Sequence, residues 1–190
     1  MKLASLKAGR DGELIVVSRD LTRAVVAASV APTLQAALDD WGTCSPALEA
    51  LYATLNGGQA KGAFDFEPEA CDAPLPRAYH WADGSAYVTH VELVRKARGA
   101  ELPASFWKDP LVYMGASDAF IGPRDDIEIE NEDWGIDFEA EVVVVTDDVP
   151  AGVNADQAAG HIKLLGLVND VSLRNLIPAE LCKQFGFYQS

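Results

Sequence analysis

The segment from Asp137 to Val145 constrains the fold of this 190-residue chain more than any other stretch. Two glutamates, Glu139 and Glu141, stand two residues apart at the start of a run of four valines. β-Branched residues favour strands, and alternate side chains of a strand point to the same face. The segment therefore predicts a strand that carries both carboxylates on one face, where two like charges need a counter-charge.

The neighbouring sequence offers no such counter-charge, because no lysine or arginine occurs between Arg124 and Lys163. A bound divalent cation is one solution, and oxygen ligands favour Mg²⁺, Mn²⁺ or Ca²⁺. The three histidines have no HExxH or HxxxH spacing, so the pattern is not that of a typical zinc hydrolase. A glutamate pair of this kind also occurs at solvated strand edges, so the pair alone leaves both interpretations open.

Composition excludes several classes of protein. The formal net charge of −14 argues against a general nucleic-acid binder, because phosphate contacts need a basic surface. The apolar runs are too short to span a membrane, and the first residues lack the apolar core of a signal peptide. Three scattered cysteines, Cys44, Cys71 and Cys182, are typical of reduced thiols, each expected to be buried, in a cytoplasmic protein.

Residues 1–72 read as a small β-rich domain. Strands are expected at 13–18 and 24–30, and helices at 33–41 and 47–55. Ser45 is the expected N-cap of the second helix, with Pro46 in its first turn, and the glycines after Asn56 end it. Residues 67–76 hold three prolines and little periodicity, which indicates a linker.

Residues 73–190 predict a second domain, with many short strands and few helices, so the fold class is α+β and β-rich. The expected elements are strands at 119–122, 126–129, 139–146 and 164–169, a helix-like segment after Asn154 at 156–161, and a helix or irregular segment at 91–97. Asp170 follows an apolar run and would face a cleft at the mouth of its strand. Asp83, His90 and Asp170 each have an ordinary structural interpretation when taken alone.

Taken together and in order, five blocks resemble the fumarylacetoacetate hydrolase family. One block runs from Asp83 to His90, and another places Tyr113 and Gly115 after Pro110. The others are 121–127, the Asp-x-Glu-x-Glu motif at 137–141, and the Asn-Asp-x-Ser-x-Arg motif at 169–174. The resemblance covers 75–190 and, more loosely, the N-terminal domain. It implies an SH3-like N-terminal β domain, a mixed β-roll catalytic domain and a homodimer.

The resemblance also implies a site. Four carboxylates would hold one divalent cation (Mg, Mn or Ca): Asp83, Glu139, Glu141 and Asp170. His90 would activate water, Tyr113 would contact the substrate, and Arg98 and Arg95 would pair with its carboxylate. Arg174 matches a family arginine of structural rather than catalytic character.

The implied reaction is hydrolysis of a carbon–carbon bond in a β-diketo acid such as fumarylacetoacetate. Decarboxylation or isomerisation of a related oxo-diacid, or acylpyruvate hydrolysis, uses the same chemistry and stays open. The family's active-site lysine and the glutamate partner of its histidine lie beyond the part of the pattern found here. We therefore expect the front part of a longer enzyme, with little activity alone, or else an inactive fragment that only binds metal or dimerises.

Overall fold

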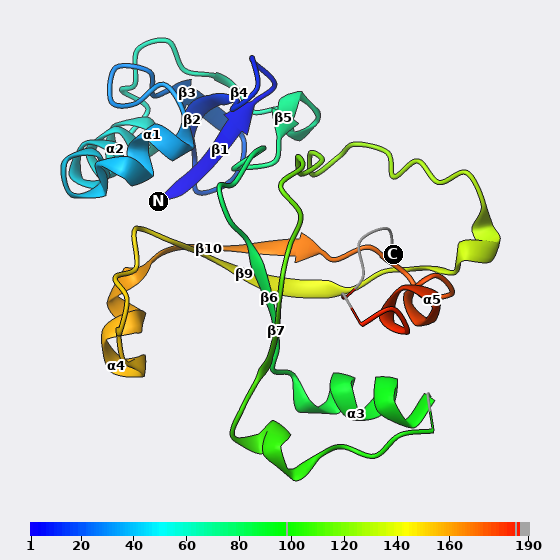
Figure 1. Ribbon diagram of the computed structural model, residues 1–190. Coiled ribbons are helices and arrows are strands. Elements are labelled where there is room, and N and C mark those ends of the chain that lie inside the picture. Colours follow the sequence, from blue (N-terminus) through cyan, green and yellow to red (C-terminus); the bar gives the residue numbers. More distant parts are fainter. Residues whose placement is uncertain (98, 185, 187–190) are drawn as a thin grey trace.

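The computed structural model describes residues 1–97, 99–184 and 186 (Figure 1). Its N-terminal part is an antiparallel five-stranded sheet in the order β4-β3-β2-β1-β5. The strands are β1 (Lys2–Leu6), β2 (Glu13–Val17), β3 (Arg23–Val26), β4 (Phe64–Asp65) and β5 (Cys71–Asp72).

Strand β2 is buried on both faces. Leu14 and Val16 point into the larger core cluster, which includes helical residues, whereas Ile15 and Val17 point into a smaller cluster with Cys71. This division follows from the two-residue alternation of strand side chains. It also explains why 14–17 reads as a continuous apolar run rather than an alternating one.

Two helices cover one side of this sheet. Helix α1 (Leu34–Asp39) begins after Thr33, whose hydroxyl accepts a hydrogen bond from the Ala36 amide at 3.1 Å. Helix α2 (Trp41–Asn56) ends at Gly57, as expected. The expected start at Ser45 is wrong, because α2 begins four residues earlier and contains Pro46. The Asp40 carbonyl accepts hydrogen bonds from the amides of residues 43 and 44, so the first turn forms ahead of the proline.

Two other expectations for this part need correction. The strand expected at 24–30 stops at Val26, where the chain turns and the Ala27 amide donates to the Leu14 carbonyl. The segment 67–76 is more than a linker. It contains the 3₁₀ turn Pro68–Ala70 and strand β5, in which Cys71 is buried and pairs with Leu6 of β1.

The C-terminal part contains three separate antiparallel strand pairs, β6–β7, β8–β11 and β9–β10. Its strands are β6 (Ala82–Ser85), β7 (Leu111–Met114), β8 (Ile136–Asp137), β9 (Ala140–Thr146), β10 (Ile162–Asn169) and β11 (Ser172–Leu173). Its helices are α3 (Val88–Ala97), α4 (Ala155–Ala158) and α5 (Ile177–Leu181), with 3₁₀ turns at Ala104–Trp107, Glu132–Trp134 and Ala159–His161. The expected α+β, β-rich fold class is confirmed.

Some of the elements that the sequence predicts for the C-terminal part are present, and others are not. The helix-like segment after Asn154 is confirmed, with Asn154 and Gln157 forming a reciprocal capping box. The strands expected at 119–122 and 126–129 are wrong, since neither segment pairs with another strand. Instead, the Gly122 amide donates to the Asp125 carboxylate at 2.9 Å and closes a tight turn.

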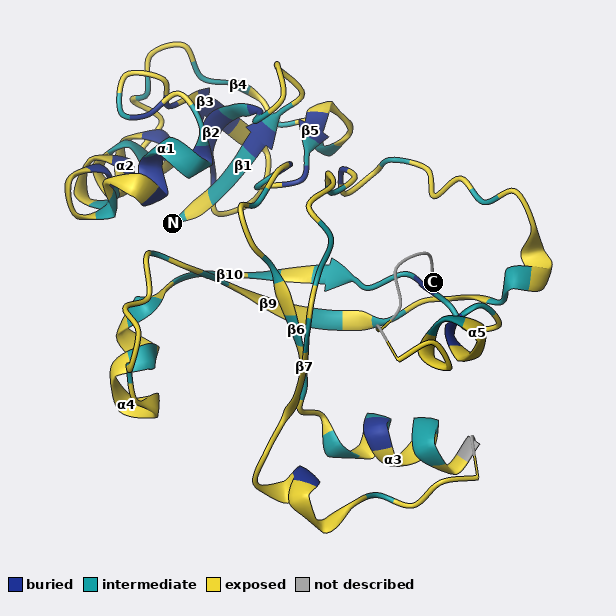
Figure 2. Cartoon of the chain, in the orientation of Figure 1, coloured by how far each residue is buried: buried dark blue, intermediate teal, exposed yellow. Residues whose placement is uncertain are grey.

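Burial differs sharply between the two parts of the chain (Figure 2). Most buried hydrophobic residues belong to the N-terminal sheet and its helices. On the β9–β10 pair, Leu165 is 72% exposed and Leu167 is 85% exposed. Their cross-strand partners are exposed as well, Val144 to 47% and Val142 to 72%. Of the cysteines, Cys44 and Cys71 are buried as expected, but Cys182 is exposed. None of the described helices is long and apolar enough to cross a membrane.

Candidate metal centre

The antiparallel β9–β10 pair brings two carboxylates to one of its ends. Val168 of β10 faces Glu141 of β9, and Asp170 directly follows β10. The Asp170 amide donates to the Glu139 carbonyl at 2.9 Å, so these two residues lie opposite each other. The Asn169 side chain accepts from the Glu139 amide at 3.2 Å and holds the same end of the pair closed. Pairing of strands about thirty residues apart therefore places Glu141 beside Asp170.

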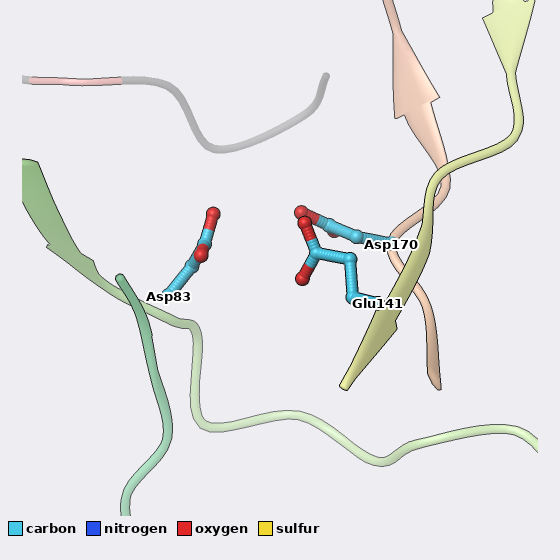
Figure 3. A group of neighbouring side chains, drawn as sticks. All are labelled: Asp83, Glu141 and Asp170. Atoms are coloured by element: carbon cyan, nitrogen blue, oxygen red, sulfur yellow. The ribbon is translucent and has the colours of Figure 1, made fainter. Parts of the chain in front are cut away.

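The third carboxylate comes from the β6–β7 pair, which crosses the β9–β10 pair (Figure 1). Asp83 of β6 offers a carboxylate oxygen that lies within 4.8 Å of oxygens of Glu141 and Asp170. The three carboxylates face one another from opposite sides of a small space (Figure 3). All three residues are partly buried. Three chain segments far apart in sequence thus supply one cluster of carboxylate oxygens that could hold a metal ion.

The three clustered carboxylates disfavour one another's charged forms. Burial, followed by the charge of Asp170, raises the pKa of Asp83 above its usual value. Burial, followed by the charges of Asp83 and Asp170, likewise raises the pKa of Glu141. Two full negative charges 4.8 Å apart repel by roughly 3 kcal/mol at an effective dielectric constant of about 20, before solvent screening. A divalent cation would turn this repulsion into attraction.

Tyr113 lies against two of these carboxylates. It faces Asp83 in the β6–β7 register, and its hydroxyl donates to Asp170 Oδ2 at 2.9 Å. Burial, together with the charge of Asp170, raises the pKa of Tyr113 well above its usual value, so the phenol stays a neutral donor. The ring is also held by an edge-on contact with Trp81, at 6.0 Å between ring centroids. Tyr113 therefore touches the ligand cluster itself.

Glu139 lies apart from the three-carboxylate cluster. Its side chain is 13% exposed, and its Oε1 contacts the Arg174 guanidinium. Arg174 Nε also donates to Asp137 Oδ2 at 2.9 Å, and this hydrogen bond lowers the pKa of Asp137. The expectation that no basic residue neutralises the glutamate pair is therefore wrong for Glu139. Pairing of β8 with β11 brings Arg174 back from thirty-five residues away, which a local reading of the sequence does not anticipate.

His90 lies on α3, with Nε2 3.4 Å from Glu139 Oε1. Its side chain is 42% exposed, so water reaches the imidazole. Arg95, in the last turn of the same helix, donates to the Glu101 carbonyl at 3.3 Å. Arg98 lies outside the described residues. The structure thus brings His90 to Glu139, and it gives Arg95 a backbone partner.

Comparison with known families assigns both parts of the chain. Residues 1–77 match the family described as fumarylacetoacetase N-terminal domain 2, and residues 79–189 match the fumarylacetoacetate (FAA) hydrolase C-terminal family. The chain belongs to the fumarylacetoacetate hydrolase family. A search of curated proteins finds no match. Membership in this family supports an activity of the hydrolase, isomerase or decarboxylase type. The domain boundary at residue 72 stays a prediction.

The cluster fits the divalent metals that fumarylacetoacetate hydrolase family proteins commonly use. Its donors are carboxylate oxygens, which suit hard cations. Two further residues support the cluster and were missed from the sequence. Asp137 anchors Arg174, and Asn169 holds the Glu139 amide. The available signals were their places in the motifs: Asn169 directly precedes Asp170, and Asp137 begins the Asp-x-Glu-x-Glu motif. Neither has a neighbour in sequence that indicates its partner.

Proposed function

We propose that this chain carries the metal centre of an enzyme that cleaves a carbon–carbon bond in a β-diketo acid such as fumarylacetoacetate. The observation that supports this most is the cluster of Asp83, Glu141 and Asp170, which has oxygen ligands from two crossing strand pairs. The histidine beside Glu139 adds a candidate base next to that cluster. Family membership makes hydrolysis, isomerisation and decarboxylation the relevant reaction types.

A 1,3-dicarbonyl acid suits this arrangement because its two carbonyl oxygens can occupy neighbouring positions on one cation. When bound, the cation supplies Lewis acidity that polarises the carbonyl and stabilises enolate charge. His90 would take a proton from the attacking water, since histidine is the side chain most often used as a general base and this one is open to solvent. Tyr113, kept protonated, would orient Asp83 and Asp170 and offer its hydroxyl to the substrate.

The substrate carboxylate would be bound by arginine. Arg95 would have to exchange its hydrogen bond with the Glu101 carbonyl for that carboxylate. Arg98 is retained as the second candidate on the strength of the resemblance alone. A bidentate contact from either guanidinium would fix the orientation of the acid.

The family resemblance also suggests that the protein is a homodimer. The exposed leucines and valines of the β9–β10 pair support this, because a second copy could cover them. Sedimentation velocity would test it.

Titration with Mn²⁺ tests the metal centre. We expect isothermal titration calorimetry to give one site per chain, and Asp170→Asn or Glu141→Gln to weaken binding at least about tenfold. Asp126→Asn is the matched control, because Asp126 is exposed and does not belong to the three-carboxylate cluster. Equal Mn²⁺ affinity in the cluster variants and the control would remove the basis of the proposal.

A panel of β-diketo acids tests the substrate class. We expect the metal-loaded protein to shift the ultraviolet absorbance of fumarylacetoacetate or an acylpyruvate, because chelation favours the enolate form. Glu141→Gln should abolish the shift. Product analysis separates the alternatives: hydrolysis releases two acids, decarboxylation releases carbon dioxide, and isomerisation conserves mass. Metal binding without any diketo-acid response would rule out this substrate class.

A further inference from the structure

We propose that Arg174 is an internal counter-ion that Glu139 exchanges for the divalent cation, so that Arg174 sets how tightly the centre binds metal. This inference rests on the proposed metal centre. Glu139 belongs to the Asp-x-Glu-x-Glu motif, yet its carboxylate contacts Arg174 and stays outside the cluster of Asp83, Glu141 and Asp170.

The backbone of Glu139 is already in position for a metal ligand. Its amide and carbonyl are both bonded, to Asn169 and Asp170 respectively, so its place opposite Asp170 is held independently of its side chain. Glu139 directly precedes β9 and stands two residues from Glu141 of that strand. Rotation of the Glu139 side chain is therefore the movement required to bring its carboxylate towards the cluster.

Arg174 can remain in place after Glu139 leaves. Its Nε donates to Asp137 Oδ2 at 2.9 Å, and its amide donates to the Gly135 carbonyl at 2.9 Å. A guanidinium has five N–H donors in a planar fork, so it can bind two carboxylates and keep one. Asp137 thus serves as the permanent partner, and Glu139 as the exchangeable one.

The exchange has a thermodynamic consequence. Glu139 is mostly buried, so its carboxylate needs a partner at all times. Arg174 contacts it in this structure, with His90 Nε2 3.4 Å away, and the cation would replace Arg174 after the exchange. When a ligand group is held elsewhere for part of the time, the apparent affinity for the metal falls in proportion to the fraction of time for which the group is available. Removing the guanidinium should therefore tighten metal binding, whereas a merely structural arginine would loosen it or leave it unchanged when removed.

A double-mutant cycle tests the exchange. We expect Arg174→Gln to lower the dissociation constant for Mn²⁺ by roughly three- to tenfold, as measured by calorimetry. Arg174→Lys, which keeps the charge but loses the fork, should give a smaller decrease. In a Glu139→Gln background, Arg174→Gln should no longer change the affinity, because the competing carboxylate is gone. Arg77→Gln is the matched control, since Arg77 pairs with Asp11 in an exposed ion pair of its own.

Thermal unfolding supplies a second measurement. Without metal, Arg174→Gln should be less stable than the wild type, and saturating Mn²⁺ should narrow that difference. Unchanged or weaker Mn²⁺ binding by both Arg174 variants would overturn the exchange. If Asp170→Asn and Glu141→Gln still weaken binding in that case, the metal centre stands and only the role of Arg174 fails. If those variants have no effect either, the proposed function fails with it.

Discussion

The hydroxyl of Tyr113 donates a hydrogen bond to Oδ2 of Asp170 at 2.9 Å and so joins β7 to the end of β10. Fifty-seven residues separate the two in sequence. Tyr113 also faces Asp83 in the β6–β7 register, so one phenol lies against two of the three clustered carboxylates. The hydroxyl proton supplies a small part of the positive charge that this cluster needs.

Tyr113→Phe should lower the free energy of unfolding by roughly 1–2 kcal/mol in metal-free buffer, because a hydrogen bond to a carboxylate is lost. Saturating Mn²⁺ should shrink this loss, since the cation then holds the carboxylates together. Urea unfolding followed by circular dichroism measures both values. Tyr87→Phe is the control, because Tyr87 is 78% exposed. Equal effects of the two substitutions would contradict the role given to Tyr113.

Gly115→Ala should destabilise the protein by roughly 1–3 kcal/mol through overpacking. A Cβ at this position would overlap the ring of Trp81, which contacts both Tyr113 and Phe120. The near-ultraviolet circular dichroism of the aromatic residues should change together with the urea midpoint. Gly84→Ala is the matched control, since a Cβ there meets nothing within 4 Å. A Gly115→Ala protein as stable as that control would show that Trp81 moves aside freely.

The pH dependence of stability should separate Asp83→Asn from the wild type. The pKa of Asp83 is raised from its usual 3.8, first by burial and then by Asp170. The folded state therefore binds this proton more tightly than the unfolded state, and wild-type stability falls as pH rises through the raised pKa. In metal-free buffer, the stability advantage of Asp83→Asn should grow between pH 4 and pH 7. Asp137, whose pKa is lowered, contributes equally to both proteins. A constant or shrinking advantage would contradict the raised pKa.

Leu14→Ala should lower the free energy of unfolding by roughly 2–4 kcal/mol, because Leu14 is fully buried between β2 and the helices. Leu167→Ala provides the comparison, since Leu167 also lies in a strand but is 85% exposed. We expect a change of about 0.5 kcal/mol or less for Leu167. Urea unfolding measures both. Similar losses would contradict the exposure of Leu167 and show that its side chain is packed as closely as that of Leu14.

Elements whose causes are local were predictable from the sequence. The strand at 13–18, the helix at 33–41 and the capped turn after Asn154 depend on side-chain periodicity and on caps within a few residues. Pro46 led to the wrong helix start, because proline usually lies in the first turn of a helix, whereas α2 starts four residues before Ser45. The segments at 119–122 and 126–129 look like strands but pair with no strand in the part of the chain that the structure describes. Strand formation needs a partner, and the local sequence carries no information about one.

The sequence by itself determined which groups are candidates for the site: the carboxylates, the histidine, the tyrosine and the arginine stand in motifs that resemble those of the family. Only the tertiary structure decided which of these side chains lie together. Asp83 lies close to Glu141 and Asp170, whereas Glu139 forms an ion pair with Arg174. The reason is physical, because charge pairing depends on distance in space. Strand pairing across dozens of residues sets those distances, whereas residue type and local spacing leave them open.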